Sequence, residues 1–280
     1  MISRRLLLAS VPALVVAKGA GAAISMTPAE RLQTMIRMRG SIDGRPCGGW
    51  LDAVRVTVID GEIVPFCRML AGSLSRFEKR GDMYEATTME VCYYLHPETG
   101  ALLENFQFPG ATESVPVPVY RSGVAKVRFS AALDEWEEHD PIGNKKGSVE
   151  FAPKSSVHLV RGVGLPKVDN GSLYLRADEY GRVYPDRSAP PTVFYREWMT
   201  WRARAKDLLE SDAPSVPADF IYAALSSWRP WMKMGKIKGN TAENGHGAKV
   251  ESSKEFPEEL RDLLLRNDPD VLRDPVRVLG

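Results

Sequence analysis

The feature that most constrains the fold is a series of short strand-like segments between residues 54 and 176, spaced about ten residues apart and separated by turn residues. In residues 54–59 valine occupies every second position, and the hairpin signal Asp60-Gly61 follows directly. A parallel sheet would need crossover helices between these segments, and none is predicted there. We therefore expect a mainly β (α+β) fold, in which an antiparallel meander forms a barrel or sandwich of lipocalin-like character. Further turn signals occur at residues 80–82, 96–100 and 170–171.

Helices are predicted on both sides of this β region. Thr27 to Glu30 form a capping box with proline at the first helical position, so a short N-terminal helix should run to about Arg39 and stop at Gly40. Without an internal repeat or a low-complexity linker, residues 23–280 should form a single domain with C-terminal helices docked on the β body. These helices are predicted at residues 193–210, 217–228 and 257–267, the first because Phe194, Trp198, Trp201, Ala205 and Leu208 recur at helical spacing.

The first residues have the pattern of a twin-arginine export signal. Arg4 and Arg5 precede an apolar run to Ala17, and the small residues 20–22 offer a cleavage site. The run is too short to span a bilayer, and no later run approaches the roughly 20 residues of a membrane helix. We expect cleavage after Ala22 and a periplasmic or secreted protein without stable membrane insertion. An uncleaved tail or a lipid-facing anchor is the alternative.

Composition and missing motifs exclude several classes of function. The formal net charge is +1, which argues against a nucleic-acid partner, since such partners require a basic face. The sequence contains no GxSxG elbow, dinucleotide fingerprint, P-loop or HExxH motif. The four histidines lack metal-ligand spacing, so we expect neither a cofactor nor a metal. The acidic segment 134–140 could bind a hard cation, although a solvated loop is the simpler interpretation.

The three cysteines, Cys47, Cys67 and Cys92, leave two alternatives open. An oxidising compartment would allow one disulfide and one remaining thiol. Three buried free thiols are the other possibility. Because no CxxC pair occurs, the sequence does not predict a zinc site.

A candidate ligand site lies between residues 226 and 250. Pro230 should hold Trp228 and Trp231 in a defined relation, which suits a ring-bearing ligand, or the two indoles close one end of a barrel. The following glycine-rich segment, residues 235–250, reads as a loop that could close over a ligand. His246 lies in it between two glycines and could transfer protons.

A second group of candidates lies in the strand "EVCYYL". Glu90, Cys92 and Tyr94 should share one face, while Tyr93 points to the other. If the first set faces inward, a carboxylate and a phenol share an apolar cavity, and burial would raise the carboxyl pKa. If Tyr93 faces inward, the interior is apolar and Glu90 is solvated. Arg76 could stabilise an oxyanion, or it could be a surface strand residue.

Several segments in order resemble the domain of unknown function 1838 family, whose members are mostly bacterial and often exported. They are "RGSIDGRPCGGW" from Arg39, "SRFE" from Ser75, "EVCYYLHPETGALL" from Glu90 and "SWRPWMKMG" from Ser227, followed by "HGAKV". The resemblance covers most of the chain after the signal and implies no established activity. Cys92 departs from the small residue expected there. Residues 108–120 also lack the asparagine–proline–tyrosine stretch of the family; if that stretch shapes the ligand end, we expect a different ligand for this member.

Two hypotheses follow. The first is an exported, cofactor-independent lyase, isomerase or cyclase acting on a hydrophobic, ring-containing small molecule by general acid–base catalysis. Its catalytic candidates are His246, Glu90, Tyr94 and Arg76, and its ligand contacts are Trp228, Trp231 and Tyr93. The second is a periplasmic binding or carrier protein that uses the same cavity without chemistry. A structural protein with a tryptophan interface is a third possibility.

Overall fold

The computed structural model describes residues 22–129, 136–141, 156–164, 166–184 and 190–280. The predicted signal segment lies outside this description apart from Ala22. The side chains of the acidic segment 134–140 lie outside it as well.

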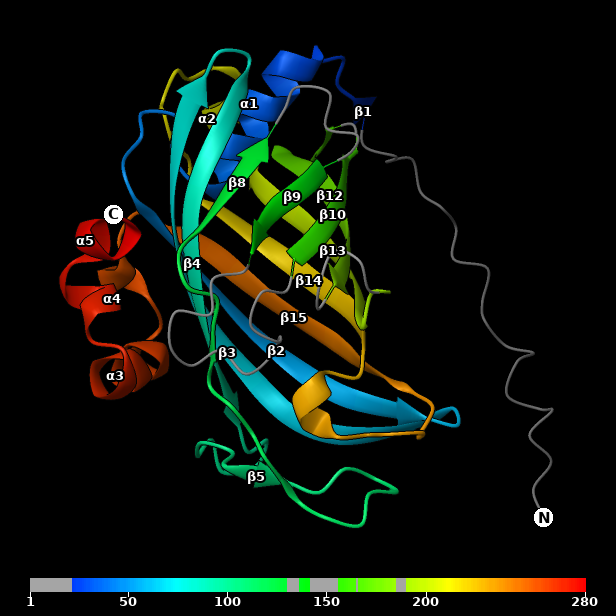
Figure 1. The fold of residues 1–280 in the computed structure, drawn as a ribbon. Helices are drawn as coiled ribbons and strands as arrows, with labels where there is room; N and C mark the ends of the chain where they lie inside the picture. Colours follow the sequence, from blue (N-terminus) through cyan, green and yellow to red (C-terminus); the bar gives the residue numbers. More distant parts are fainter. Residues whose placement is uncertain (1–21, 130–135, 142–155, 165, 185–189) are drawn as a thin grey trace.

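One 13-stranded sheet dominates the molecule, and its paired strands run antiparallel (Figure 1). Its path is β1-β11-β12-β13-β14-β15-β2-β3-β4-β7, with β10 beside β12, β9 beside β10 and β8 beside β4. A short pair, β5 with β6, stands apart. The strands are β1 (Ala22–Ala23), β2 (Cys47–Ile59), β3 (Glu62–Arg80), β4 (Met83–Leu95), β5 (Asn105–Phe106), β6 (Val115–Pro116), β7 (Tyr120–Arg121), β8 (Ala125–Phe129), β9 (Trp136–Pro141), β10 (Ser156–Val163), β11 (Lys167–Asp169), β12 (Ser172–Tyr184), β13 (Val193–Arg204), β14 (Ala218–Ser227) and β15 (Asn240–Val250).

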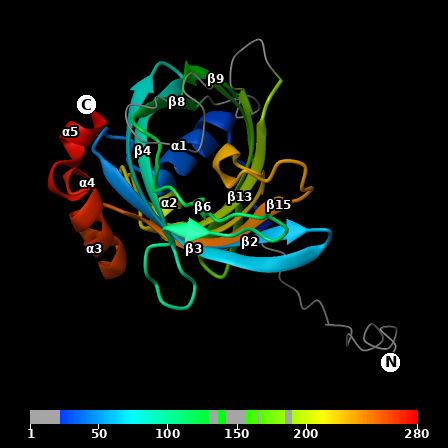
Figure 2. The ribbon, with the colours of Figure 1, turned by 60° about the horizontal axis from the view of Figure 1, so that its bottom comes forward.

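The sheet curls strongly around its inner face, as Figure 2 shows, but it does not close. Among the described residues, no ladder joins β8 to β9, so the sheet is not a closed barrel. The predicted antiparallel, mainly β fold is therefore confirmed, whereas closure into a barrel was wrong. The Asp60-Gly61 hairpin also forms as predicted, with both residues at positive φ.

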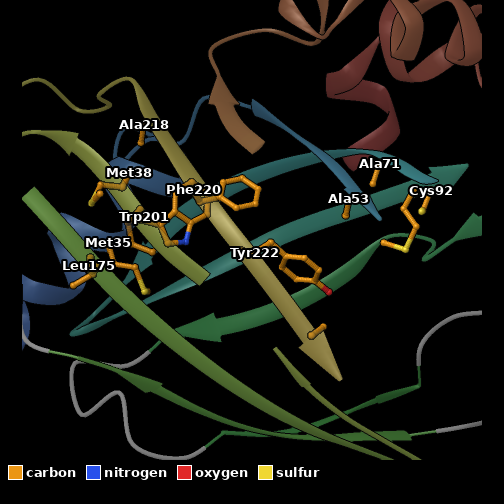
Figure 3. Close-up of a cluster of buried hydrophobic side chains, with 14 of the residues drawn as sticks. Met35, Met38, Ala53, Ala71, Cys92, Leu175, Trp201, Ala218, Phe220 and Tyr222 are labelled. Carbon is orange, nitrogen blue, oxygen red and sulfur yellow. The ribbon is translucent and has the colours of Figure 1, made fainter. Parts of the chain in front are cut away.

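Helix α1 (Pro28–Arg39) lies inside one end of the curled sheet (Figure 2). It begins with the predicted capping box, in which Thr27 and Glu30 satisfy each other's backbone N–H groups. Its buried Met35 and Met38 join Trp201 and Phe220 of the sheet in the inner core (Figure 3). The helix therefore closes this end of the interior.

Three short helices cover the outer face of β3 and β4: α3 (Glu258–Asn267), α4 (Asp270–Arg273) and α5 (Pro275–Leu279) (Figure 1). The helix predicted at residues 257–267 is thus confirmed. Leu260, Leu263 and Leu264 pack in a second core with Leu70 and Tyr93 of the sheet. The 3₁₀ turn η2 (Ser253–Glu255) leads into these helices.

The helices predicted at residues 193–210 and 217–228 were wrong. These residues form β13 and β14, and only α2 (Ala205–Leu209) is helical. Burial alternates with period two along β14, which turns Phe220 and Tyr222 inward and Ile221 outward. Aromatic residues on both faces of β13 produced a false helical stripe, because a period of 3.6 can be traced through any dense apolar segment.

The predicted glycine-rich loop was also wrong over residues 240–250, which form β15 in the middle of the sheet. Its glycines make room for rings on the neighbouring strand. A Cβ atom at Gly247 would overlap the ring of Phe220, which lies directly opposite on β14. Gly181 of β12 accommodates Tyr195 of β13 in the same way. These glycines therefore reflect close packing rather than a loop.

All three cysteines are free and buried, which corresponds to the second of the two alternatives left open by the sequence.

Candidate functional site

The inner face of the sheet encloses a cavity of about 360 Å³. A volume in this range suits a drug-sized ligand. Near α1 its described lining is aromatic, with the guanidinium of Arg39 over two of the rings, and elsewhere it is mainly polar; the rings are Phe77, Phe129, Trp201 and Phe220. The polar lining includes four glutamates and four tyrosines: Glu90, Glu179, Glu197, Glu243, Tyr94, Tyr120, Tyr195 and Tyr222.

A buried ion pair forms part of this wall. Arg55 of β2 lies opposite Glu243 of β15 and contacts its Oε1 atom through Nε at 2.7 Å and through a terminal nitrogen at 2.6 Å. The other terminal nitrogen donates to the Tyr94 hydroxyl at 3.1 Å, and the guanidinium lies over the Tyr94 ring. Arg55 therefore holds both Glu243 and Tyr94 in place.

Tyr222 connects this pair to a second carboxyl group. Its hydroxyl lies 3.1 Å from Glu243 Oε2 and 3.2 Å from Glu197 Oε1. A hydroxyl has one proton to donate, whereas an ionised carboxylate can only accept. Both contacts are hydrogen bonds only if one carboxyl is protonated and donates to the tyrosine oxygen. Because Glu243 is already paired with Arg55, Glu197 is the group that carries the proton.

The surroundings of Glu197 favour the same protonation state. Burial, together with the nearby carboxylates of Glu179, Glu243 and Glu90, raises the pKa of Glu197 to about 8. Burial also raises the pKa of the Tyr222 hydroxyl, and Glu197 and Glu243 raise it further. The wall thus presents a carboxyl group with a raised pKa, Glu197, beside a second one, Glu243, that is paired with Arg55.

The strand containing Glu90 adopts the first of its two predicted orientations. Glu90, Cys92 and Tyr94 line the cavity on β4, and Figure 2 shows β4 and β13 on opposite sides of the interior. The presence of Glu90 among the charges that act on Glu197 agrees with this arrangement. The cavity therefore has carboxyl groups on facing walls.

Tyr93 points the opposite way and is buried beneath the C-terminal helices. Its hydroxyl donates to Asp268 Oδ2 at 2.6 Å, and Arg121 binds the same carboxylate at 2.5 and 2.9 Å. Burial raises the pKa of Tyr93, and the Asp268 carboxylate raises it further. Tyr93 thus lies outside the cavity, in the outer core.

Arg76 and His246 also lie on the outer face of the sheet. Arg76 donates to the Gly280 carbonyl at 2.8 Å and pairs with Glu78 at 3.4 Å, next to the C-terminal helices. His246 is exposed, and its ring meets Trp50 edge to face at 5.5 Å. The structure therefore does not bring either residue together with Glu90 and Tyr94. The reason is the alternation of β3 and β15, which turns these positions outward.

Trp228 and Trp231 lie at the end of the sheet opposite α1, around the 3₁₀ turn η1 (Pro230–Met232) (Figure 1). The Trp231 ring lies near Phe66, Tyr94 and Phe108, at centroid distances of 6.2, 6.3 and 5.9 Å. The Trp228 indole donates to the Ile237 carbonyl at 2.9 Å. Neither tryptophan is among the described cavity-lining residues, so a direct ligand contact stays a prediction.

Sequence reasoning missed Arg55, Glu197, Tyr222 and Glu243. A period-two reading of residues 193–204 and 218–227 would have placed Glu197 beside Met199 and Trp201, and Tyr222 beside Phe220, on an inward face. The pairing of Arg55 with Glu243 had no local signal, because 188 positions separate the two residues.

Within the described residues, no group of three or more histidine, cysteine, aspartate or glutamate side chains could hold a metal ion. The described helices include none that is both long and apolar enough to cross a membrane.

Three of the four missed site residues, Glu197, Tyr222 and Glu243, lie on β13, β14 and β15, and Arg55 lies on β2. Residues 174–279 match the family model for proteins of unknown function DUF1838. The predicted family resemblance is thereby confirmed over this part of the chain. The DUF1838 segment contains Glu197, Tyr222 and Glu243, and it also contains the C-terminal helices. No curated protein matches the chain. The family description names no activity, so the function has to be argued from the site.

Proposed function

We propose that this protein is a cofactor-independent enzyme that moves protons on an uncharged, ring-containing small molecule bound in the cavity. The observation that carries the proposal is the hydrogen-bonded chain Glu197–Tyr222–Glu243–Arg55 along the cavity wall. A neutral carboxylic acid held beside a fixed, paired carboxylate is the arrangement required for a general acid at neutral pH. Tyrosine rings and the aromatic end near α1 suit a ring-bearing ligand.

An isomerisation fits this arrangement. Glu90 takes a proton from the carbon between a carbonyl group and a carbon–carbon double bond, while Glu197 gives its proton to the carbonyl oxygen, which produces a dienol. The Glu197 carboxylate is then stabilised by the Tyr222 hydroxyl. Return of the Glu90 proton to the far end of the dienol and of the hydroxyl proton to Glu197 yields the isomer with the double bond next to the carbonyl group and restores both glutamates. No outside reactant is needed.

The test uses steroids, terpenoids and linked aromatic dimers, each incubated with the protein from Ala23 to Gly280. Liquid chromatography with mass spectrometry of the recovered compounds should show a product of unchanged mass and new retention time. Glu197→Gln and Glu90→Gln should each lower the rate by about 100-fold or more. Glu85→Gln is the matched control, because Glu85 lies on the outer face of β4, paired with Lys126. Compounds that are retained but unchanged would instead support the carrier alternative.

We also propose that the protein acts in the periplasm or outside the cell. The support is the twin-arginine pattern at Arg4 and Arg5, followed by the apolar run to Ala17. Cell fractionation of the full chain tests this proposal. Replacing both arginines by lysine should retain the protein in the cytoplasm, and an unchanged distribution would contradict it.

A further inference from the structure

Residues 117–123 form a strap that links the cavity to the outer core. The short strand β7 within it pairs with β4 at two positions, Tyr120 opposite Cys92 and Arg121 opposite Val91. Tyr120 lines the cavity. Its neighbours divide between the two cores, since Val117 packs with the inner one and Val119 with the outer one.

The same strap holds the backbone of Glu90. The Ser122 N–H donates to the Glu90 carbonyl at 2.9 Å, and the Glu90 N–H donates to the Ser122 hydroxyl at 2.8 Å. Both backbone polar groups of Glu90 on this side of β4 are therefore satisfied by a single residue of the strap. The strap is therefore attached to this part of β4 by two paired ladder positions and by the hydrogen bonds of Ser122, which are few contacts to hold a segment of the cavity wall.

A charged clasp on the outer face secures this anchor. The Arg121 guanidinium binds both oxygens of Asp268, the residue that follows α3, and Tyr93 of β4 donates to the same carboxylate. The Asp268 side chain is only 14 % exposed, so solvent screens the pair weakly. The clasp thus joins three elements: the strap, β4 and the C-terminal helices.

We infer that the Arg121–Asp268 pair is a positioning device for the cavity, which fixes Glu90 and Tyr120 from the opposite face of the sheet. Neither Arg121 nor Asp268 is among the described cavity-lining residues, so their effect on Glu90 and Tyr120 passes through β7 and Ser122. The catalytic part of this inference rests on the proposed role of Glu90. The placement of the strap does not depend on that role.

Hydrogen exchange tests the placement without any ligand. In Arg121→Met, amides of residues 117 and 119–123 and of Glu90 should exchange about tenfold faster or more, while those of β2 and β15 keep the wild-type rates. The charge-swapped variant Arg121→Asp with Asp268→Arg should recover much of the protection. Asp270→Asn is the control, since Asp270 pairs with Arg277 in the same helical layer at an exposed position. Wild-type protection of the strap in Arg121→Met would overturn the inference.

Kinetics test the catalytic part on any compound that the protein converts. Arg121→Met should lower kcat by about tenfold with a smaller change in KM, and the charge swap should restore it. If the strap loosens and kcat stays unchanged, the clasp does not position Glu90 for catalysis. If no compound is converted, the exchange experiment still decides whether the clasp holds the strap.

Discussion

Arg55 and Glu243 form an ion pair across neighbouring strands β2 and β15, and their side chains are only 5 % and 4 % exposed. Such a pair is costly to desolvate, and it is costlier still when one partner is left alone. Its presence in the cavity wall, hydrogen-bonded to Tyr94 and Tyr222, agrees with the functional role proposed above.

Breaking this pair on one side should destabilise the fold. Arg55→Met leaves the Glu243 carboxylate buried without its cation, and we expect a loss of about 3–5 kcal/mol in the free energy of unfolding. The double variant Arg55→Met with Glu243→Met should recover most of that loss, because no charge remains buried. Urea titration followed by circular dichroism measures both. Arg202→Met is the control, since its pair with Asp219 is about half exposed and should cost at most about 1 kcal/mol. Equal losses in Arg55→Met and Arg202→Met would contradict the buried-pair argument.

The free energy of unfolding should fall as the pH rises from about 4.5 to about 8, because of the raised pKa of Glu197. Its pKa is raised from 4.5 to about 8 in the folded state, so between these values the folded chain holds a proton that the unfolded chain has released. The stabilisation is complete below about pH 4.5 and is lost as the pH rises through about 8. Glutamine cannot titrate, so Glu197→Gln should remove this slope. The stability difference between the two proteins should change by roughly 1–3 kcal/mol between pH 5 and pH 8.5, and a constant difference would mean that Glu197 is ionised throughout.

His246→Gln should leave turnover within about twofold of the wild-type rate. The residue lies on the outer face beside Trp50, on the opposite side of β15 from Glu243. This expectation reverses the hypothesis drawn from the sequence, in which His246 transferred protons. Steady-state rates on a converted compound decide between the two. A loss of 100-fold or more would restore His246 to the catalytic machinery.

Gly247→Ala should destabilise the protein by about 1–3 kcal/mol, because the added methyl group overlaps the Phe220 ring and the Trp50 carbonyl. The midpoint of urea unfolding should shift without a change in its slope. Asn244→Ala, an exposed position on the same strand, should shift it little. A Gly247→Ala protein as stable as the wild type would show that β14 and β15 are packed less closely than described.

Local chemistry allowed part of this fold to be predicted. The capping box of α1, the Asp60-Gly61 hairpin and the α3 helix depend on residues within a few positions of one another, so their signals are complete in the sequence. The alternation around Glu90 likewise predicted that Glu90, Cys92 and Tyr94 share a face. It could not tell which face turns inward, because both carry large side chains that are covered in the fold, one in the cavity wall and the other under the C-terminal helices.

The sequence by itself determined the antiparallel β class, the turns and the positions of α1 and α3, since these follow from neighbouring residues. Only the tertiary structure decided that residues 193–204, 218–227 and 240–250 are strands. The reason is that glycines on one strand leave room for aromatic rings on the neighbouring strand, and this contact exists only in the folded sheet. It also decided the protonation of Glu197. That state depends on burial and on three carboxyl groups from other strands. Glu179 lies directly opposite Glu197 on β12 and Glu243 lies two strands away on β15, whereas Glu90 of β4 acts on Glu197 because the sheet curls around one small, poorly solvated space.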